Sequence, residues 1–526
     1  MPGFERPFFP IIFVRGYAGN DSEIESTVAE PYMGFNLGST KYRQAWDGSV
    51  HRYYFESPLL RLMKDYGYQD VYSGGQEMPL DCEIGPKSIF IYRYYDEQYF
   101  DALMGRSGDS TAISGESRKI EEFAEGLSRL ILRIRDRMCG SDQTAKEAFR
   151  VYLVAHSMGG LVCRSFLQNT QIGDSEARKC IDKVFTYATP HNGIDFKIIG
   201  NVPGFFTLND ANTFNRKRMA EYLALRDESE PANLEGKFYP ERFFCLVGTD
   251  WQDYAVAYGW ASRLVGPMSD GLVRIANATV YSQTSADSPK KHGPNAFVSR
   301  SHSGYFGIVN SEEGYQNLIR FLFGDMRVDG VLELDSITLP KDVQKAKDDG
   351  KQIRASYHFE TVVRVRGYDW VLHCRTVRDE SAVFRTYDEM FPKNGSKPRC
   401  PYLFSIFLSA MQKVKANRPS LGFAIDLNVL VPEYEIDGTW WRDQHYKGSY
   451  LFQDTIIVET TPQKSDSGDV TYKVRYGLNS KTPNQSTKTV EVEATTDGKY
   501  ICRIPIESGT IPGITGRLVL TAIEWR

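Results

Sequence analysis

The stretch VYLVAHSMGG, residues 151–160, decides the fold. Five mostly apolar residues run into His156 and Ser157, and two glycines follow directly. An apolar run that meets a small-residue turn is typical of a buried strand passing sharply into a helix. Such a turn lifts a serine hydroxyl clear of its backbone, and it requires small residues two positions before and two after, here Ala155 and Gly159. The stretch therefore predicts a nucleophile elbow with Ser157 at its apex. The alternative is a serine in a tight turn that does no chemistry.

The sequence around this elbow alternates between two patterns. Helical spacing of apolar residues runs through 117–138, 160–170 and 313–324. Short apolar runs that read as buried strands lie at 10–16, 88–94, 149–155, 184–190 and 243–249. Strand–helix alternation implies a mostly parallel sheet with helices on both faces. We therefore expect an α/β domain over residues 1–328.

The pattern changes near residue 330. From there to the end, β-branched and often alternating runs are separated by turn residues. This is typical of an all-β sandwich, here of roughly ten strands. The sequence predicts a C-terminal β-sandwich domain over residues 329–526, with a charged loop or short helix at 341–352.

Composition excludes some classes of protein. The chain has 526 residues, too many for one ordinary core, and its net charge of −4 argues against a nucleic-acid partner. Eight scattered cysteines without a CxxC pair favour reduced thiols, with one disulfide as the alternative. The N-terminal residues lack a signal-peptide pattern, and no window holds 18 apolar residues. We expect a cytoplasmic protein, with export by a leaderless route as the alternative.

A nucleophilic serine needs a histidine base, and the histidine needs a carboxylate that orients it. In folds with this elbow the chain order is serine, acid, histidine. His302 lies in a loop just ahead of the predicted helix 313–324, where such a base belongs, whereas His292 falls in a charged turn. The other histidines that follow a plausible acid fall in the β-rich part: His358, His373 and His445. His302 is the predicted base.

Two aspartates compete for the role of the acid. Asp270, in GPMSDGLVRIA, follows a turn and comes 32 residues before His302. Asp250 directly follows the strand 243–249, and catalytic loops gather at the carboxyl ends of strands in such sheets. Asp270 is preferred, Asp250 is the main alternative, and Asp253 and Glu312 are minor ones.

An oxyanion hole requires two backbone amides. One is expected from Met158, the residue after the nucleophile, and the other from the loop after an early strand. IIFVRGYAGN supplies that loop, in which Gly16 allows close approach and Tyr17 is the expected donor.

Taken together, PIIFVRGYAG, LVAHSMGGLVCR, TYATPHNG, SDGLV and SHSGY resemble the α/β-hydrolase lipases and esterases, in particular the bacterial triacylglycerol-lipase and PGAP-like group. The resemblance covers about residues 8–325 and implies a triad of Ser157, Asp270 and His302. It also implies that His191 is structural and lines the floor of the site, with a role as base as the alternative.

The chain departs from this group where Arg15 stands in place of a histidine. An arginine can hydrogen-bond the oxyanion loop, or contact an acidic or phosphate-bearing substrate. Arg15, Gly16 and His156 are expected to line the substrate pocket. Some relatives bind calcium, but no acidic cluster has suitable spacing here, so neither a metal nor a cofactor is predicted.

Two further segments are candidates for substrate contact. Residues 195–236 form an insertion that is expected to cap the pocket as a lid, with Phe205 and Phe206 on an acyl-binding wall; ordinary core packing is the alternative. Trp440 and Trp441 are candidates for docking the β domain on a membrane or other lipid surface, and core packing is as good an interpretation.

The leading hypothesis is a serine carboxylic-ester hydrolase, a lipase or esterase with phospholipase activity included, that acts on a lipid or other acyl ester through an acyl-enzyme. The alternatives are an acyltransferase with the same triad, and a binding protein that has kept the fold without its chemistry.

Overall fold

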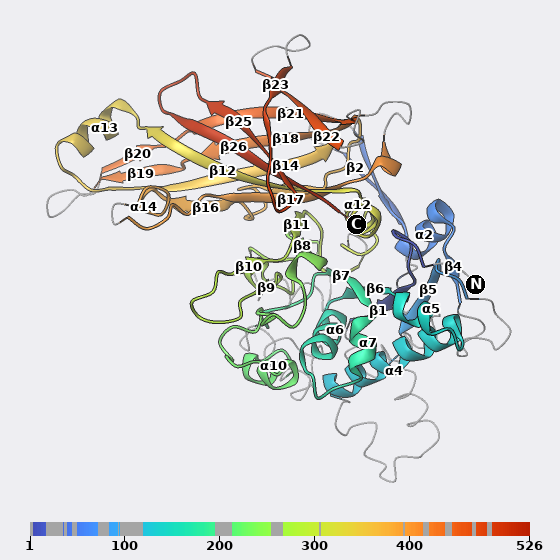
Figure 1. Cartoon of the computed structure of the whole chain (residues 1–526). Helices are drawn as coiled ribbons and strands as arrows, with labels where there is room; N and C mark the ends of the chain where they lie inside the picture. Colours follow the sequence, from blue (N-terminus) through green and yellow to red (C-terminus); the bar gives the residue numbers. More distant parts are fainter. Residues whose placement is uncertain are drawn as a thin grey trace. The chain divides into compact units, whose positions relative to one another are not determined.

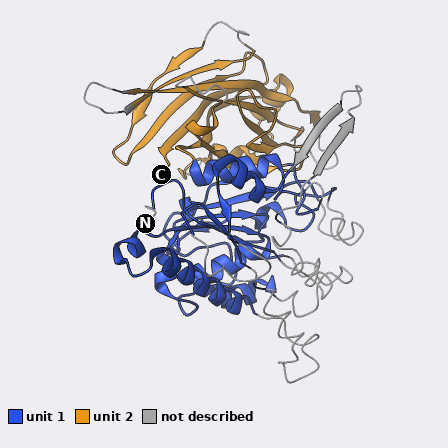
Figure 2. Ribbon diagram, turned by 90° about the vertical axis from the view of Figure 1, so that its right-hand side faces the viewer, with its two compact units in different colours: residues 1–295, 299–323 blue, residues 296–298, 324–526 orange. Residues whose placement is uncertain are grey.

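The computed structural model describes residues 4–16, 35, 39–44, 50–71, 84–92, 94, 119–194, 213–253, 267–304, 307–392, 395–413, 420–436, 444–464, 470–480 and 487–525. The chain divides into two compact units (Figure 2). Unit 1 comprises residues 1–295 and 299–323, and unit 2 comprises residues 296–298 and 324–526.

Unit 1 is built on a sheet whose described strands follow the order β11-β8-β7-β6-β1-β5-β4, in which only Asn295 of β11 is counted with unit 1. Neighbours from β8 to β4 pair in parallel, and the four strands from β8 to β1 are almost entirely buried. Continuous apolar runs are what strands covered on both faces require, and the five predicted strands are confirmed. The bounds are β1 Ile11–Val14, β4 Gln69–Asp70, β5 Ser88–Tyr92, β6 Val151–His156, β7 Ile181–Tyr187, β8 Phe243–Gly248 and β11 Asn295–Val298.

Helices cover the two faces of this sheet (Figure 1). α6 packs on β1 and β6, and α12 packs on β7 and β8 from the other side. α4 buries Phe123, Leu127 and Ile131 along one stripe, as its helical spacing predicts. The helices of unit 1 are α2 Pro58–Tyr66, α4 Ile120–Cys139, α5 Gln143–Ala148, α6 Met158–Gln168, α7 Ser175–Lys179, α10 Arg216–Leu223 and α12 Glu312–Phe323. Its smaller elements are β2 Ser39–Gln44, β3 Val50–Phe55, β9 Tyr281–Ser282, β10 Lys291–His292, η1 Pro240–Arg242 and η3 Ile275–Asn277.

Unit 2 is an antiparallel β-sandwich, as predicted, with its apolar core between the sheets. One sheet contains β17 Tyr402–Leu408, β12 Met326–Thr338, β26 Gly513–Glu524, β25 Lys499–Glu507 and β24 Val492–Ala494 in that order. The other follows β15 His373–Arg375, β14 Ser356–Val365, β18 Leu421–Leu430, β21 Tyr450–Lys464, β22 Val470–Leu478 and β23 Lys488–Val490, with β16 Val383–Thr386 also on β14. A small third sheet joins β13 Ile353–Arg354, β19 Glu433–Ile436 and β20 Gln444–Lys447.

The described part of unit 2 has more strands than the roughly ten expected. The additional ones are short, such as β13 with two residues and β16 with four, and a run of that length shows little readable alternation. The charged segment 341–352 begins with a helix, α13 Lys341–Asp348, and the small elements α14 Tyr387–Met390 and η4 Ala410–Gln412 complete the unit.

Two further expectations concern the described residues. Among the described helices, none combines the length and apolar character needed to cross a bilayer. The cysteines within the described ranges all carry free thiols.

Candidate active site

Ser157 stands at the turn between β6 and α6, where it is the N-cap residue of the helix. Its backbone has φ 53° and ψ −126°, a conformation that residues with a side chain rarely adopt. The turn is held on both sides: the Ser157 amide donates to the Tyr187 carbonyl at 2.9 Å, and Thr189 Oγ1 donates to the Ser157 carbonyl at 2.8 Å. The surrounding structure therefore imposes a strained conformation on this serine, as the elbow motif predicts.

Positions 159 and 16 require glycine, because the first turn of α6 and the end of β1 approach each other closely. A Cβ on Gly159 would lie 2.3 Å from the Val14 carbonyl oxygen and 2.4 Å from that of Arg15. A Cβ on Gly16 would lie 2.9 Å from the Cβ of Ser157. The first turn of α6 thus contacts the end of β1 directly, which brings residues 15 and 16 beside the elbow.

The side chains of Ser157, His302 and Asp270 form a continuous hydrogen-bonded chain, and all three are buried. Ser157 Oγ lies 3.0 Å from His302 Nε2, and His302 Nδ1 lies 2.9 Å from Asp270 Oδ2. The other oxygen of Asp270 accepts from the amides of Leu272 at 3.0 Å and Val273 at 2.7 Å. Because these amides fix the carboxylate, Asp270 Oδ2 is placed to accept a hydrogen bond from His302 Nδ1, and Nε2 of the same ring then faces the Ser157 hydroxyl.

Loops at the carboxyl ends of the strands hold this arrangement. The His302 amide donates to the Asp270 carbonyl at 2.9 Å, which ties the two loops together. At the end of β8, a Cβ on Gly248 would lie 2.7 Å from the Cβ of Asp270 and 2.5 Å from the Arg300 carbonyl oxygen. A larger residue at position 248 would therefore displace both loops.

His156 reaches the same loop from the elbow. Its Nε2 lies 3.0 Å from the His302 carbonyl oxygen, so Nε2 carries the proton and donates it. Desolvation, followed by the proximity of His302 and Arg15, lowers the pKa of His156 to about 3. His156 is therefore neutral near pH 7 and positions the His302 backbone. The sequence predicts this residue only as lining the pocket.

The alternative residues are engaged elsewhere. Asp250 Oδ1 accepts from the amides of Gln252 at 3.1 Å and Asp253 at 3.2 Å, so this carboxylate caps its own loop. Burial and the neighbouring Asp253 raise the pKa of Asp250 to about 6. Glu312 pairs with Arg61 at 2.5 Å. Buried His191 lies with Nε2 3.1 Å from Thr186 Oγ1.

The expected oxyanion region is only partly described. Met158 is the first residue of α6, where helix amides have no partner within the helix. Arg15 and Gly16 are fixed through their carbonyls, which accept from the Tyr94 hydroxyl at 2.8 and 3.0 Å. Sequence reasoning missed Tyr94, whose only signal is its place at the end of the run 88–94. Tyr17, Phe205, Phe206, Trp440 and Trp441 lie outside the described residues.

Part of the proposed lid can be traced. Residues 195–212 lie outside the described ranges, whereas 213–236 are described. In that part, α10 packs on α6, and Ser165 Oγ donates to the Tyr222 carbonyl at 3.0 Å. This end of the insertion is thus anchored. Among the described residues, no group of three or more histidine, cysteine or acidic side chains could hold a metal ion.

One protein family matches the chain. The profile of the PGAP1-like alpha/beta domain covers residues 95–222, which include β6, the elbow and α6. This match confirms the resemblance that the sequence motifs indicated, and unit 1 has the α/β-hydrolase fold. A search among curated proteins finds no sequence match.

Several solved structures are similar to the chain. Lipase BlEst2 from Bacillus licheniformis, in mature form, is 14% identical, with 61% of this chain and 93% of that chain covered and a TM-score of 0.30. Phospholipase PlaB from Legionella pneumophila is 12% identical, with coverage of 92% and 100% and a TM-score of 0.31. A putative cell surface hydrolase from Lactobacillus plantarum WCFS1 is 12% identical, with coverage of 60% and 91% and a TM-score of 0.20. Likenesses this distant carry no argument about the substrate.

Proposed function

We propose that this protein is a serine carboxylic-ester hydrolase that acts on a lipid or other acyl ester, with lipase, esterase and phospholipase reactions within its scope. The observation that carries the proposal is the hydrogen-bonded chain from Ser157 through His302 to Asp270, which begins at a strained elbow. The PGAP1-like domain match supports a hydrolase fold around it.

In the proposed reaction, Ser157 Oγ attacks the acyl carbonyl carbon while His302 Nε2 takes the hydroxyl proton. Asp270 stabilises the imidazolium that forms. The Met158 and Tyr17 amides bind the oxyanion, and one such donor is typically worth about 100- to 1000-fold in turnover. His302 then protonates the leaving alkoxide, and a water that it activates releases the acid and restores Ser157.

The proposal extends to the organisation of the chain. Residues 1–328 would form the hydrolase domain, with residues 195–236 as its lid, and Arg15, Gly16, His156, Phe205 and Phe206 at the substrate pocket. Residues 329–526 would form an accessory β-sandwich that contacts a lipid surface.

The test is hydrolysis of p-nitrophenyl esters of increasing acyl length by the intact protein and by Ser157→Ala, His302→Ala and Asp270→Asn. We expect each variant to lose turnover by about 10⁴-fold or more. Ser165→Ala is the matched control, because it removes a buried serine hydroxyl from α6 away from His302. If the intact protein neither hydrolyses any ester nor reacts with a fluorophosphonate probe, Ser157 is not activated and the proposal is wrong.

A further inference from the structure

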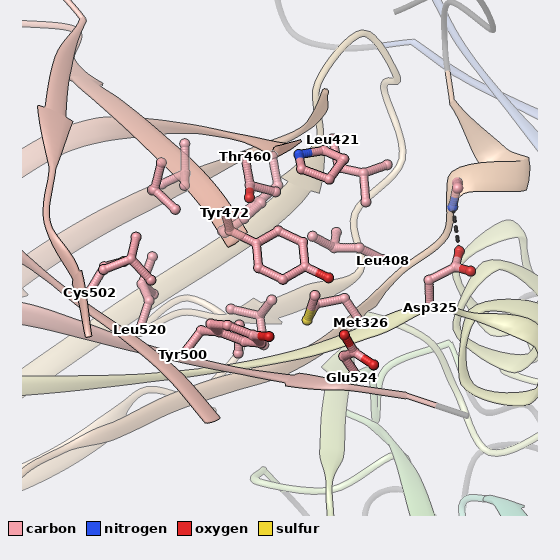
Figure 3. Close-up of a pocket in the computed structure, with 18 of the residues that line it drawn as sticks. Asp325, Met326, Leu408, Leu421, Thr460, Tyr472, Tyr500, Cys502, Leu520 and Glu524 are labelled. Carbon is pink, nitrogen blue, oxygen red and sulfur yellow. Dashed lines mark hydrogen bonds between the residues drawn. The ribbon is translucent and has the colours of Figure 1, made fainter. Parts of the chain in front are cut away.

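A cavity of about 290 Å³ lies inside unit 2, between its two main sheets (Figure 3). One wall is formed by side chains of β17, β12, β26, β25 and β24, and the other by side chains of β18, β21 and β22. The volume is close to the lower end of the range for small-molecule sites. The cavity is lined entirely by residues of unit 2.

The strand register explains why these side chains share one space. On the first sheet, Val328, Ala522 and Tyr500 are direct cross-strand neighbours, so they point to the same face. On the second sheet, Thr460 pairs with Leu421 and with Val474, which places these three on one face as well. The two faces oppose each other across the cavity, and Ala522 and Thr460 are among the short side chains in its lining.

The cavity is apolar inside and polar at its rim. Its depth is lined by fully or nearly buried Val328, Leu408, Phe423, Val458 and Leu520. The rim carries the exposed residues Asp325 and Glu524. It also carries the partly exposed Lys413, which lies along the chain between β17 of the first sheet and β18 of the second. An apolar lining offers water few hydrogen-bond partners, so a hydrocarbon is the ligand that fits this depth.

The shape of the lining favours a chain over a compact ring. Val458, Thr460 and Pro462 line the cavity from one strand, and at about 3.3 Å per residue they span roughly 13 Å. An extended alkyl chain with bonds of about 1.5 Å needs about ten carbons to cover that length. Tyr472 and Tyr500 meet edge to face, with ring centroids 4.8 Å apart, and thus connect the two sheets.

The rim also selects the head group. Asp325 and Glu524 supply two negative charges and Lys413 one positive charge. Asp325 is further fixed by the Ala410 amide, which donates to its Oδ2 at 2.6 Å (Figure 3). Among the described residues of the rim, the two carboxylates would repel a carboxylate head, whereas the hydroxyls of Tyr500 and Thr460 suit hydroxyls of an uncharged head.

We propose that unit 2 binds the alkyl chain of a single-chain lipid with an uncharged, glycerol-like head in this cavity. This site is separate from the Ser157 centre, and its occupation requires no turnover. A ligand that fills an apolar cavity also stabilises the fold that contains it.

Photocrosslinking of the full chain tests the proposal. The probe is a 1-O-dodecylglycerol ether that carries a diazirine in its alkyl chain, which contains no ester for Ser157 to cleave. We expect adducts on peptides that contain residues 421–423, 458–462, 472–474 and 520–524. Unlabelled dodecylglycerol should compete for these adducts better than dodecanoate. Adducts confined to unit 1 would overturn the lipid site in unit 2. Equal competition by dodecanoate would overturn the preference for an uncharged head.

Two variants close the cavity from opposite walls. Ala522→Phe and Thr460→Phe should each reduce the unit 2 adducts by about tenfold or more. Ala494→Phe is the matched control, because Ala494 is an exposed alanine on the same sheet that does not line the cavity. Circular dichroism checks that each variant folds, and unchanged labelling in both folded cavity variants contradicts the site. Labelling is independent of ester hydrolysis. If unit 2 is labelled but the protein shows no hydrolysis through Ser157, only the proposed function is refuted.

Discussion

Replacement of Ser157 by glycine should give a more stable protein than its replacement by alanine. Both variants lose the hydroxyl that lies 3.0 Å from His302 Nε2, so this loss cancels in the comparison. Alanine keeps the strain of φ 53° and ψ −126°, which for such conformations amounts to about 1–3 kcal/mol. Glycine relieves the strain but gains about 0.4–1 kcal/mol of unfolded-state entropy. The expected net difference in free energy of unfolding is about 0.5–2 kcal/mol in favour of glycine.

The matched control is Ser165, in the regular part of α6. It is also buried, and its hydroxyl also makes one hydrogen bond, to the Tyr222 carbonyl at 3.0 Å. In a helix interior glycine is less favourable than alanine by about 0.8–1 kcal/mol, so the order of the two variants should reverse.

Differential scanning calorimetry measures both pairs and resolves separate transitions where the units unfold independently. The Ser157 difference should shift the midpoint of the unit 1 transition by about 1–3 °C, at roughly 1.5 °C per kcal/mol for a unit of about 320 residues. If Ser157→Gly is no more stable than Ser157→Ala, or if both sites show the same order, the strain argument fails.

Two further predictions concern the neighbourhood of the elbow. Gly159→Ala should lower the kcat for ester hydrolysis by about 100-fold or more, because its Cβ would displace the Val14 end of β1 and the oxyanion loop that follows. Gly85→Ala is the control, because a Cβ on Gly85 would meet open space. Full activity of Gly159→Ala would contradict the proposed geometry. His156 has a pKa of about 3 in the fold against an ordinary 6.5, so the stability from its neutral form is present above pH 6.5 and is lost as the pH falls towards 3. His156→Gln keeps a donor for the His302 carbonyl but has no group that titrates in this pH range. Its free energy of unfolding, measured in urea, should fall less between pH 7 and pH 4 than that of the unmodified protein. An equal fall in both proteins would show that His156 is not the group concerned.

The local features of the site follow from local sequence. The run 149–155 reads as a buried strand, and the need for small residues around Ser157 marks the turn without knowledge of its neighbours. Chain order leaves several histidines, and the place of His302 in a loop just ahead of the helix 313–324 narrows the choice of base to this residue. Chain order does not separate Asp270 from Asp250, because both follow the elbow at Ser157 and precede His302. The difference appears in the fold, where Asp250 caps its own loop while Asp270 Oδ2 lies 2.9 Å from His302 Nδ1.

Other residues at the site have no signal that can be read along the chain. Tyr94 is one more aromatic residue at the end of a strand until its hydroxyl is seen to join the carbonyls of Arg15 and Gly16. The bond from His156 to the His302 carbonyl joins positions 146 residues apart. Periodicity and turn residues carry information over a few residues, whereas these contacts depend on which loops meet at one edge of the sheet.

By itself, the sequence determined the two fold classes, the elbow at Ser157 and the apolar alternation of the sandwich strands, because backbone geometry and burial act over one strand or one helical turn. Only the tertiary structure decided which aspartate faces His302, how Tyr94 and His156 hold the loops, and where the two sheets of unit 2 leave a cavity. Those outcomes depend on the register and spacing of segments far apart in the chain, and the side-chain pattern of any one segment does not encode the distance to its partner.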